Sequence, residues 1–278
     1  MDIVFTLFTT AHLRRRLTLL AAVGRYLLGE YIAMINMRNI EIGYDQQALT
    51  PPIDGCFAAG SLTAIIGANG AGKSTLLKTL ADLQPAVAGK ITFSGETRPQ
   101  IAYLPQQAEL DKQFPIVVQD VVAMGCWPQS GLLGGINYQS RQRIKQALST
   151  VGMQDMAHQP VGELSGGQLQ RVLFARLLVQ QAPLILLDEP FTGVDSQTVQ
   201  LLLDVIRQLH DEGRTIIAVL HDMAMVAEHF PRALWLTPQA YCWQQSEQVL
   251  AQWHHCHSSS CALSSLVPQP EQQRVINL

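Results

Sequence analysis

The segment Gly67-Ala68-Asn69-Gly70-Ala71-Gly72-Lys73-Ser74 constrains this chain more than any other part of its sequence. It follows a short apolar run, Leu62 to Ile66, and precedes a helix-like segment, Thr75 to Leu83. A glycine-rich turn between a strand and a helix lets backbone N–H groups surround phosphate oxygens. In this pattern the lysine reaches the β- and γ-phosphates, and the serine hydroxyl binds Mg²⁺. The segment therefore predicts a nucleoside-triphosphate site at the end of a strand.

Two further apolar runs indicate the fold class. Leu184 to Leu187 ends at Asp188, and Thr215 to Leu220 ends at His221. Continuous apolar runs of this length are typical of strands that are buried on both faces of a parallel sheet. Each run is followed by a helix-like segment, so we predict an α/β fold with a mostly parallel sheet. The carboxyl ends of such strands share one edge, where ligands bind, and Asp188 and His221 belong to that edge.

The strand signals stop between about residues 107 and 181. Helical patterns replace them at Val117 to Met124, Arg141 to Val151 and Gln168 to Val179, with a loop at Gly131 to Gly135. We predict a helical subdomain over 107–181, inserted into a domain that covers residues 34–245. Residues 246–278 are expected to form a C-terminal tail.

Residues 1–33 form an N-terminal extension in which Arg14-Arg15-Arg16 precedes an apolar segment, Leu17 to Leu28. We favour an upstream start codon, with Met34 or Met37 opening the domain. A basic amphipathic helix on a membrane surface is the alternative. The sequence has no uninterrupted apolar run of about 18 residues, the length expected of a membrane-spanning helix.

Composition narrows the classes of partner and compartment. The formal net charge of −3 provides no basic footprint for nucleic acid. Charged residues make up 15% of the chain, against about 25% in typical soluble domains. That difference is consistent either with a partner that covers part of the surface or with an enzyme of few charges. Five scattered cysteines without disulfide-like spacing favour a reducing compartment.

The pair Asp188-Glu189 supplies two carboxylates where a buried strand ends. Charged groups are costly at such a position unless a cation or other partner compensates them. Asp188 is placed to hold Mg²⁺, and Glu189 to polarise an attacking water. A surface turn that ends in Pro190 is the structural alternative.

A second glycine-rich turn, Leu164-Ser165-Gly166-Gly167-Gln168, precedes another helical run. It has the form of an anion site at a helix N-terminus, because free N–H groups and the helix dipole point at the ligand. No lysine follows it, so by itself it is half a phosphate site.

Together these motifs resemble the ATP-binding subunit of an ABC transporter, from Met37 to about Leu236. The phosphate loop, the signature Leu164 to Gln168 and the strand that ends in Asp188-Glu189 occur in that family's order. The resemblance implies a P-loop NTPase of the ABC type with ATP and Mg²⁺ as cofactors. It implies that Glu189 activates water and that His221 is the switch histidine. It assigns Ser74, Gln106 and Asp188 to Mg²⁺. It assigns to ATP the residues Tyr44, Gly67, Ala68, Asn69, Gly70, Ala71, Gly72, Lys73, Ser74, Thr75, Gln106, Ser165, Gly166, Gly167, Gln168 and Asp195.

The same resemblance implies the partners. Two ATPase subunits face each other head to tail, and each signature turn closes over the ATP of the other subunit. The partner's Lys73 then supplies the cation that the signature turn lacks. The subunit would lie on the cytoplasmic face of the cell membrane, bound to a permease that a substrate-binding protein serves.

The run Asp111 to Gly125 is similar to the zinc, manganese and iron importer branch of the family. Importers of ferric siderophores, haem or cobalamin are the close alternative. A soluble ATPase for iron–sulfur cluster assembly is the alternative from another class. Repair ATPases carry long coiled-coil insertions and translation ATPases usually carry two ATPase domains, and this sequence shows neither.

The C-terminal tail departs from the family. It contains His254, His255, Cys256 and His257, followed by Cys261, and these residue types suit Zn²⁺. A zinc sensor is one hypothesis, and a flexible tail around Ser258 to Ser260 is the other.

Overall fold

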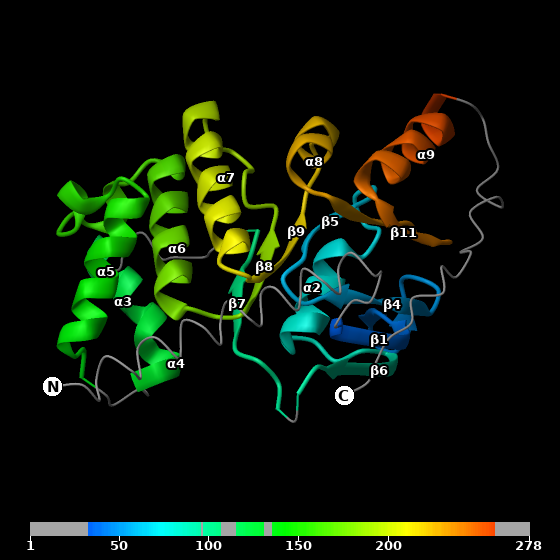
Figure 1. Cartoon of the computed structure of the whole chain (residues 1–278), viewed down its shortest axis with the longest axis horizontal. Coiled ribbons are helices and arrows are strands. Elements are labelled where there is room, and N and C mark those ends of the chain that lie inside the picture. Colours follow the sequence, from blue (N-terminus) through cyan, green and yellow to red (C-terminus); the bar gives the residue numbers. More distant parts are fainter. Residues whose placement is uncertain (1–32, 96, 107–114, 131–134, 259–278) are drawn as a thin grey trace, which may run out of the picture.

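The computed structural model describes residues 33–95, 97–106, 115–130 and 135–258 (Figure 1). Residues 1–32, most of the predicted loop at Gly131 to Gly135, and residues 259–278 lie outside these ranges. No helix in the described ranges has both the length and the apolar character needed to cross a bilayer.

A six-stranded sheet lies at the centre of the chain, in the order β11-β10-β5-β9-β8-β7. β11 is antiparallel to β10, and every other neighbouring pair is parallel. The prediction of a mostly parallel sheet is therefore confirmed. The strands, in the same order, are Tyr241–Gln245, Arg232–Leu236, Leu62–Ile66, Thr215–Val219, Leu184–Asp188 and Ile101–Leu104.

The central strands are apolar throughout because both faces of the sheet are covered. Every residue of β5, β8 and β9 is buried. Along β8, Leu184 and Leu186 belong to one hydrophobic core, and Ile185 and Leu187 belong to the other. The helix α2 (Lys73–Ala81) supplies Leu76, Leu77 and Leu80 to the core that contains Leu184. This packing holds the end of β5 and the start of α2 at a fixed distance from the end of β8.

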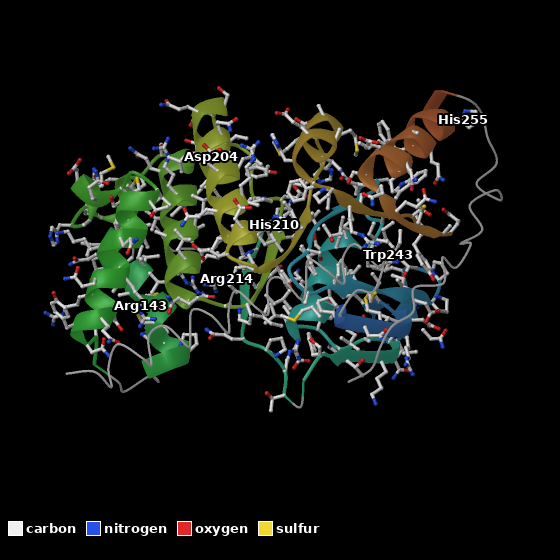
Figure 2. All side chains as sticks on the ribbon, in the orientation of Figure 1. Arg143, Asp204, His210, Arg214, Trp243 and His255 are labelled. Atoms are coloured by element: carbon white, nitrogen blue, oxygen red, sulfur yellow. The ribbon has the colours of Figure 1, made fainter. Side chains whose placement is uncertain are left out.

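A smaller antiparallel sheet covers α2 from the side opposite the central sheet (Figure 1). Its order is β4-β1-β6, formed by Ile53–Ala58, Ala33–Glu41 and Ala88–Phe93. A two-residue hairpin, β2 (Gly43–Tyr44) with β3 (Gln47–Ala48), follows β1. Trp243 lies on β11 (Figure 2). Its ring contacts Phe57 of β4 edge to face, with ring centroids 4.8 Å apart. The two sheets are thus joined through an aromatic pair.

Helices fill the sequence between β7 and β8 and gather at one end of the central sheet (Figure 1). They are α3 (Val118–Ala123), η1 (Met124–Cys126), α4 (Trp127–Ser130), α5 (Tyr138–Thr150), η2 (Gln154–Met156), η3 (Val161–Glu163) and α6 (Gly166–Gln180). α3, α5 and α6 pack together, and Arg143 lies on α5 (Figure 2). Arg143 donates to Gln181 Oε1, just after α6, at 2.9 Å. The three predicted helical segments are present, whereas the subdomain limits of 107 and 181 stay a proposal.

Three helices complete the described chain: α7 (Ser196–Asp211), α8 (Met223–His229) and α9 (Ser246–Ser258). α9 begins one residue after the boundary that we proposed at residue 245. Val249 and Leu250 of α9 are buried in the same core as Ala233 of β10. The first turns of the proposed tail therefore pack against the domain.

Candidate active site

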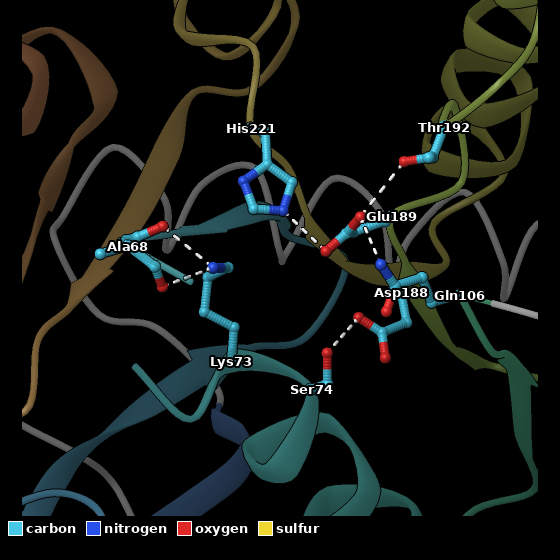
Figure 3. A network of polar contacts seen from close by, with 9 residues as sticks. Ala68, Lys73, Ser74, Gln106, Asp188, Glu189, Thr192 and His221 are labelled. Carbon is cyan, nitrogen blue, oxygen red and sulfur yellow. Dashed lines mark hydrogen bonds and ion pairs between the residues drawn. The ribbon is translucent and has the colours of Figure 1, made fainter. Parts of the chain in front are cut away.

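The phosphate-loop segment lies between β5 and α2 at the carboxyl edge of the central sheet (Figure 3). Gly72 caps α2 in the left-handed region, with φ 90°, and Lys73 begins the helix. Lys73 is only 5% exposed, and its Nζ donates to the carbonyl oxygens of Gly67 and Ala68, each at 2.9 Å. Burial lowers the pKa of Lys73, against the opposing effect of the Glu189 and Asp188 carboxylates. The ammonium is thus held inside the loop, close to two anions.

The tip of the loop is open. Asn69 and Gly70 are exposed, whereas Ala71 is buried and its N–H donates to the carbonyl oxygen of Ala68 at 3.2 Å. A side chain at Gly70 would meet nothing within 4 Å, whereas a Cβ at Gly67 would lie 2.2 Å from the carbonyl oxygen of Leu236. Both glycines have positive φ, 151° at Gly67 and 78° at Gly70.

This contrast predicts different costs for two alanine substitutions. Gly70→Ala should lower the free energy of unfolding by about 1–2 kcal/mol, the cost of a left-handed residue with a Cβ. Gly67→Ala should lower it by about 1–3 kcal/mol more, because its Cβ also overlaps the backbone of β10. Urea denaturation of both variants without nucleotide measures the difference. Equal losses would show that the contact with Leu236 carries no cost.

Two side chains contact the carboxylate at the end of β8. Ser74 Oγ donates to Asp188 Oδ1 at 2.8 Å, and Tyr103 OH donates to Oδ2 at 3.4 Å. Asp188 is only 2% exposed. Burial raises the pKa of Asp188, against the hydrogen bond from Ser74, and burial also raises the pKa of Tyr103. The first residue of the predicted acidic pair is therefore a desolvated carboxylate beside the phosphate-loop serine.

Three residues from separate elements converge on the side chain of Glu189 (Figure 3). His221 Nε2 lies 2.7 Å from Oε1, while Gln106 Nε2 and Thr192 Oγ1 donate to Oε2 at 2.8 and 3.2 Å. Burial alone would raise the pKa of Glu189, but the hydrogen bonds with His221, Thr192 and Gln106 outweigh it and lower the pKa. Glu189 therefore favours the ionised form that a base requires. Its φ of 49° is uncommon for a residue other than glycine.

The signature turn forms the N-terminus of α6. Ser165 is the N-cap: its Oγ accepts from Gln168 N–H at 3.2 Å, and Gln168 Oε1 accepts from Ser165 N–H at 2.9 Å. Gly166 and Gly167 lie between them, as the first residues of the helix. Among the described residues, no hydrogen bond given by the structure joins this turn to Lys73, Ser74, Asp188 or Glu189.

Asp195 caps α7, a short distance from the signature turn. It accepts from Thr198 N–H at 2.9 Å and from Thr198 Oγ1 at 2.8 Å, and the backbone hydrogen bond is the main cause of its lowered pKa. A Cβ at Gly167 would lie 3.1 Å from Asp195 Oδ2, so the two turns are in close contact.

Tyr44 is 53% exposed, and its OH lies 3.2 Å from Thr75 Oγ1 at the start of α2.

Known proteins are similar to this chain over most of its length. Residues 51–192 match the family described as ABC transporter. The manganese transport system ATP-binding protein MntB of Listeria innocua is 38% identical over 222 residues, which cover 78% of this chain and 92% of that protein. The zinc transport system ATP-binding protein TroB of Treponema pallidum is 39% identical over 206 residues, which cover 73% of this chain and 77% of that protein.

The chain belongs to the ABC transporter family. It is an ABC ATPase, which binds and hydrolyses ATP. A solved inward-facing structure assigned to the metal-chelate type of ABC transporter superposes with a TM-score of 0.71 and 26% identity. That match covers 78% of this chain and 85% of the other. The ABC fold predicted from the motifs is thus confirmed.

Sequence analysis of this ABC ATPase missed some residues that contact the site. Thr192 and Tyr103 were not predicted as site residues. Thr192 is three positions after the predicted Glu189, and Tyr103 is three positions before the predicted Gln106. Their hydroxyl groups were the only signal, and hydroxyl residues are too common for that to suffice.

The proposed zinc-sensor residues are only partly described by the structure. The backbone of residues 254–257 belongs to α9, and His255 is exposed, whereas Cys261 lies outside the described residues. No cluster of three or more metal-ligating His, Cys, Asp or Glu residues occurs within the described ranges.

Proposed function

We propose that this ATPase powers a membrane importer of a divalent metal ion, either zinc, manganese or iron. The observation that carries the proposal is the likeness to ATP-binding proteins named for manganese and zinc transport, at 38% and 39% identity. The match to the manganese protein covers 92% of that protein, so it includes more than the nucleotide-binding motifs. The metal ion is the cargo, and no residue of this chain needs to bind it.

The nucleotide site fits Mg²⁺ by the chemistry of its donors. Ser74 and Asp188 place a hydroxyl and a carboxylate 2.8 Å apart, and the amide of Gln106 lies at the same edge. Oxygen ligands of these types are those that Mg²⁺ prefers. When bound, the ion would neutralise charge on the phosphates. Lys73 would bind the β- and γ-phosphates, Glu189 would accept a proton from the attacking water, and His221 would orient Glu189 and approach the γ-phosphate.

A second copy of the chain would complete each site. Ser165 to Gln168 and Asp195 lie next to each other, and within the described residues neither group is hydrogen-bonded to the phosphate loop of its own chain. A head-to-tail dimer would place these two turns against the ATP bound by the other copy. Free N–H groups at the start of α6 suit the negative charge of that phosphate.

The permease would bind near the helical segment that follows β7. Within the described part of Asp111 to Gly125, Val118, Val121 and Val122 are buried in the core, while Pro115 and Asp120 are exposed. The apolar residues of this run therefore support the helix packing, and the exposed ones are available to a partner. This arrangement would hold the ATPase at the cytoplasmic face of the membrane, with a substrate-binding protein acting on the permease.

Growth of a deletion strain tests the proposed cargo. Deleting the gene should slow growth in medium limited for one of manganese, zinc or iron. The wild-type gene should restore growth, but a Glu189→Gln gene should not, because transport needs hydrolysis. Normal growth in all three media, with a defect only when iron is supplied as siderophore or haem, would contradict metal-ion import. Loss of iron–sulfur enzyme activity without a change in metal uptake would indicate cluster assembly instead.

A further inference from the structure

Gln170 of α6 makes a hydrogen bond to the backbone beside the proposed base, Glu189. Its Nε2 donates to the carbonyl oxygen of Pro190 at 2.7 Å. Gln170 is partly buried, and Pro190 is buried directly after Glu189. The contact therefore joins the second turn of α6 to the peptide next to the proposed base.

The carbonyl that Gln170 contacts lies in the middle of a tight turn. Thr192 N–H donates to the carbonyl oxygen of Glu189 at 3.3 Å, which closes the turn over Pro190 and Phe191. The same turn lets Thr192 Oγ1 reach Glu189 Oε2 at 3.2 Å. Residues in unfavourable backbone regions persist only where their surroundings hold them, and Glu189 has φ 49°. Gln170 supplies part of that hold, because it fixes the central carbonyl of the turn.

The segment that starts at Glu189 is attached to α6 at its other end as well. Arg171 donates to Thr198 Oγ1 from Nε at 3.2 Å and from Nη2 at 2.8 Å. Thr198 Oγ1 in turn donates to Asp195 Oδ2 at 2.8 Å. Two consecutive residues of α6, Gln170 and Arg171, thus anchor the start and the end of residues 189–198. The helix that provides both anchors has Ser165 as its N-cap.

We propose that Gln170 is a positioning residue for hydrolysis, which sets Glu189 through the carbonyl of Pro190. The proposal rests on the proposed roles of Glu189 as base and of Ser165 towards the ATP of the opposite copy. A consequence follows for the dimer. The ATP that Ser165 contacts in one site acts, through the first turns of α6 and Gln170, on the Glu189 that serves the other site.

Two substitutions test this role. Gln170→Ala removes the amide, and Gln170→Glu keeps its shape but replaces the donor with an acceptor. Each should lower kcat about tenfold or more, the factor that corresponds to the free energy of one lost hydrogen bond. The KM for MgATP should stay within about twofold, because the hydrogen bond of Gln170 goes to Pro190 and not to a nucleotide-binding residue. The matched control is Gln200→Ala, on the exposed face of α7, which should leave kcat unchanged.

A second readout separates positioning of Glu189 from a general effect on α6. In a Glu189→Gln background, MgATP affinity and MgATP-dependent dimerisation should be the same with and without the additional substitution Gln170→Ala. An unchanged kcat in the single variants would overturn the proposal. Weaker dimerisation in the double variant, or unfolding of both single variants, would overturn it too, because Gln170 would then act on the signature turn or on folding. Near-normal turnover of Glu189→Gln alone would instead reject the base assignment, and this inference with it.

Discussion

Replacing Glu189 with Gln should lower ATP turnover by about 10²–10⁴-fold, the contribution typical of a general base. The amide keeps the size of the side chain but cannot accept a proton from water. ATP binding should be retained, because Lys73 and the backbone of the phosphate loop stay in place. Removing a carboxylate from the site also removes a repulsion towards the nucleotide anion. Phosphate release and equilibrium binding of MgATP measure the two effects separately.

The control for this variant is Glu228→Gln. Its side chain is 75% exposed on α8 and should contribute nothing to turnover. A Glu189→Gln protein that hydrolyses ATP at nearly the wild-type rate would mean that another group takes the proton. His221 would then be the first candidate, because its Nε2 lies 2.7 Å from the same carboxylate.

A pair of fused dimers should show that the signature turn serves the opposite copy. In the first fusion, one chain carries Lys73→Ala and the other carries Ser165→Arg. If Ser165 acts across the dimer, one whole site remains, built from an intact Lys73 of one chain and an intact Ser165 of the other. In the second fusion a wild-type chain is joined to a chain with both substitutions, and no whole site remains. We expect the first fusion to be about 10²-fold more active or more, the loss typical of removing one group that stabilises the transition state.

The two fusions contain the same substitutions, so general destabilisation cannot explain a difference between them. Steady-state ATP hydrolysis should be measured with the permease present, since a single site supports limited turnover. A site built within one chain predicts the reverse, with the second fusion active and the first inactive. That result would reject the assignment of Ser165 to the other copy's phosphate.

The parts of the candidate site that could be predicted from the sequence depend on neighbouring residues. The phosphate loop is one contiguous segment whose glycines permit a tight turn between β5 and α2, so Lys73 follows from local chemistry. The turn at Ser165 is a capping box, which two residues three positions apart make between themselves. The parallel-strand rule placed Asp188 and His221 at one edge. The small antiparallel sheet over α2 was not predicted. Ile35 and Met37 of β1 and Ile53 and Phe57 of β4 are buried, but no residue of β6 is buried, and β4 shows no regular alternation of buried and exposed residues.

The sequence by itself thus determined the family and the central parallel strands, and it predicted the nucleotide site, since these depend on local patterns of residues. The tertiary structure alone decided how Glu189 is held. Gln106 is 83 residues from Glu189 in the chain and His221 is 32 residues away, yet both hydrogen-bond to its carboxylate. Gln170 reaches Pro190 across 20 residues. Contacts of this kind depend on the packing of α6 against the sheet and on the order β9-β8-β7, and neither leaves a trace in any short stretch of the sequence.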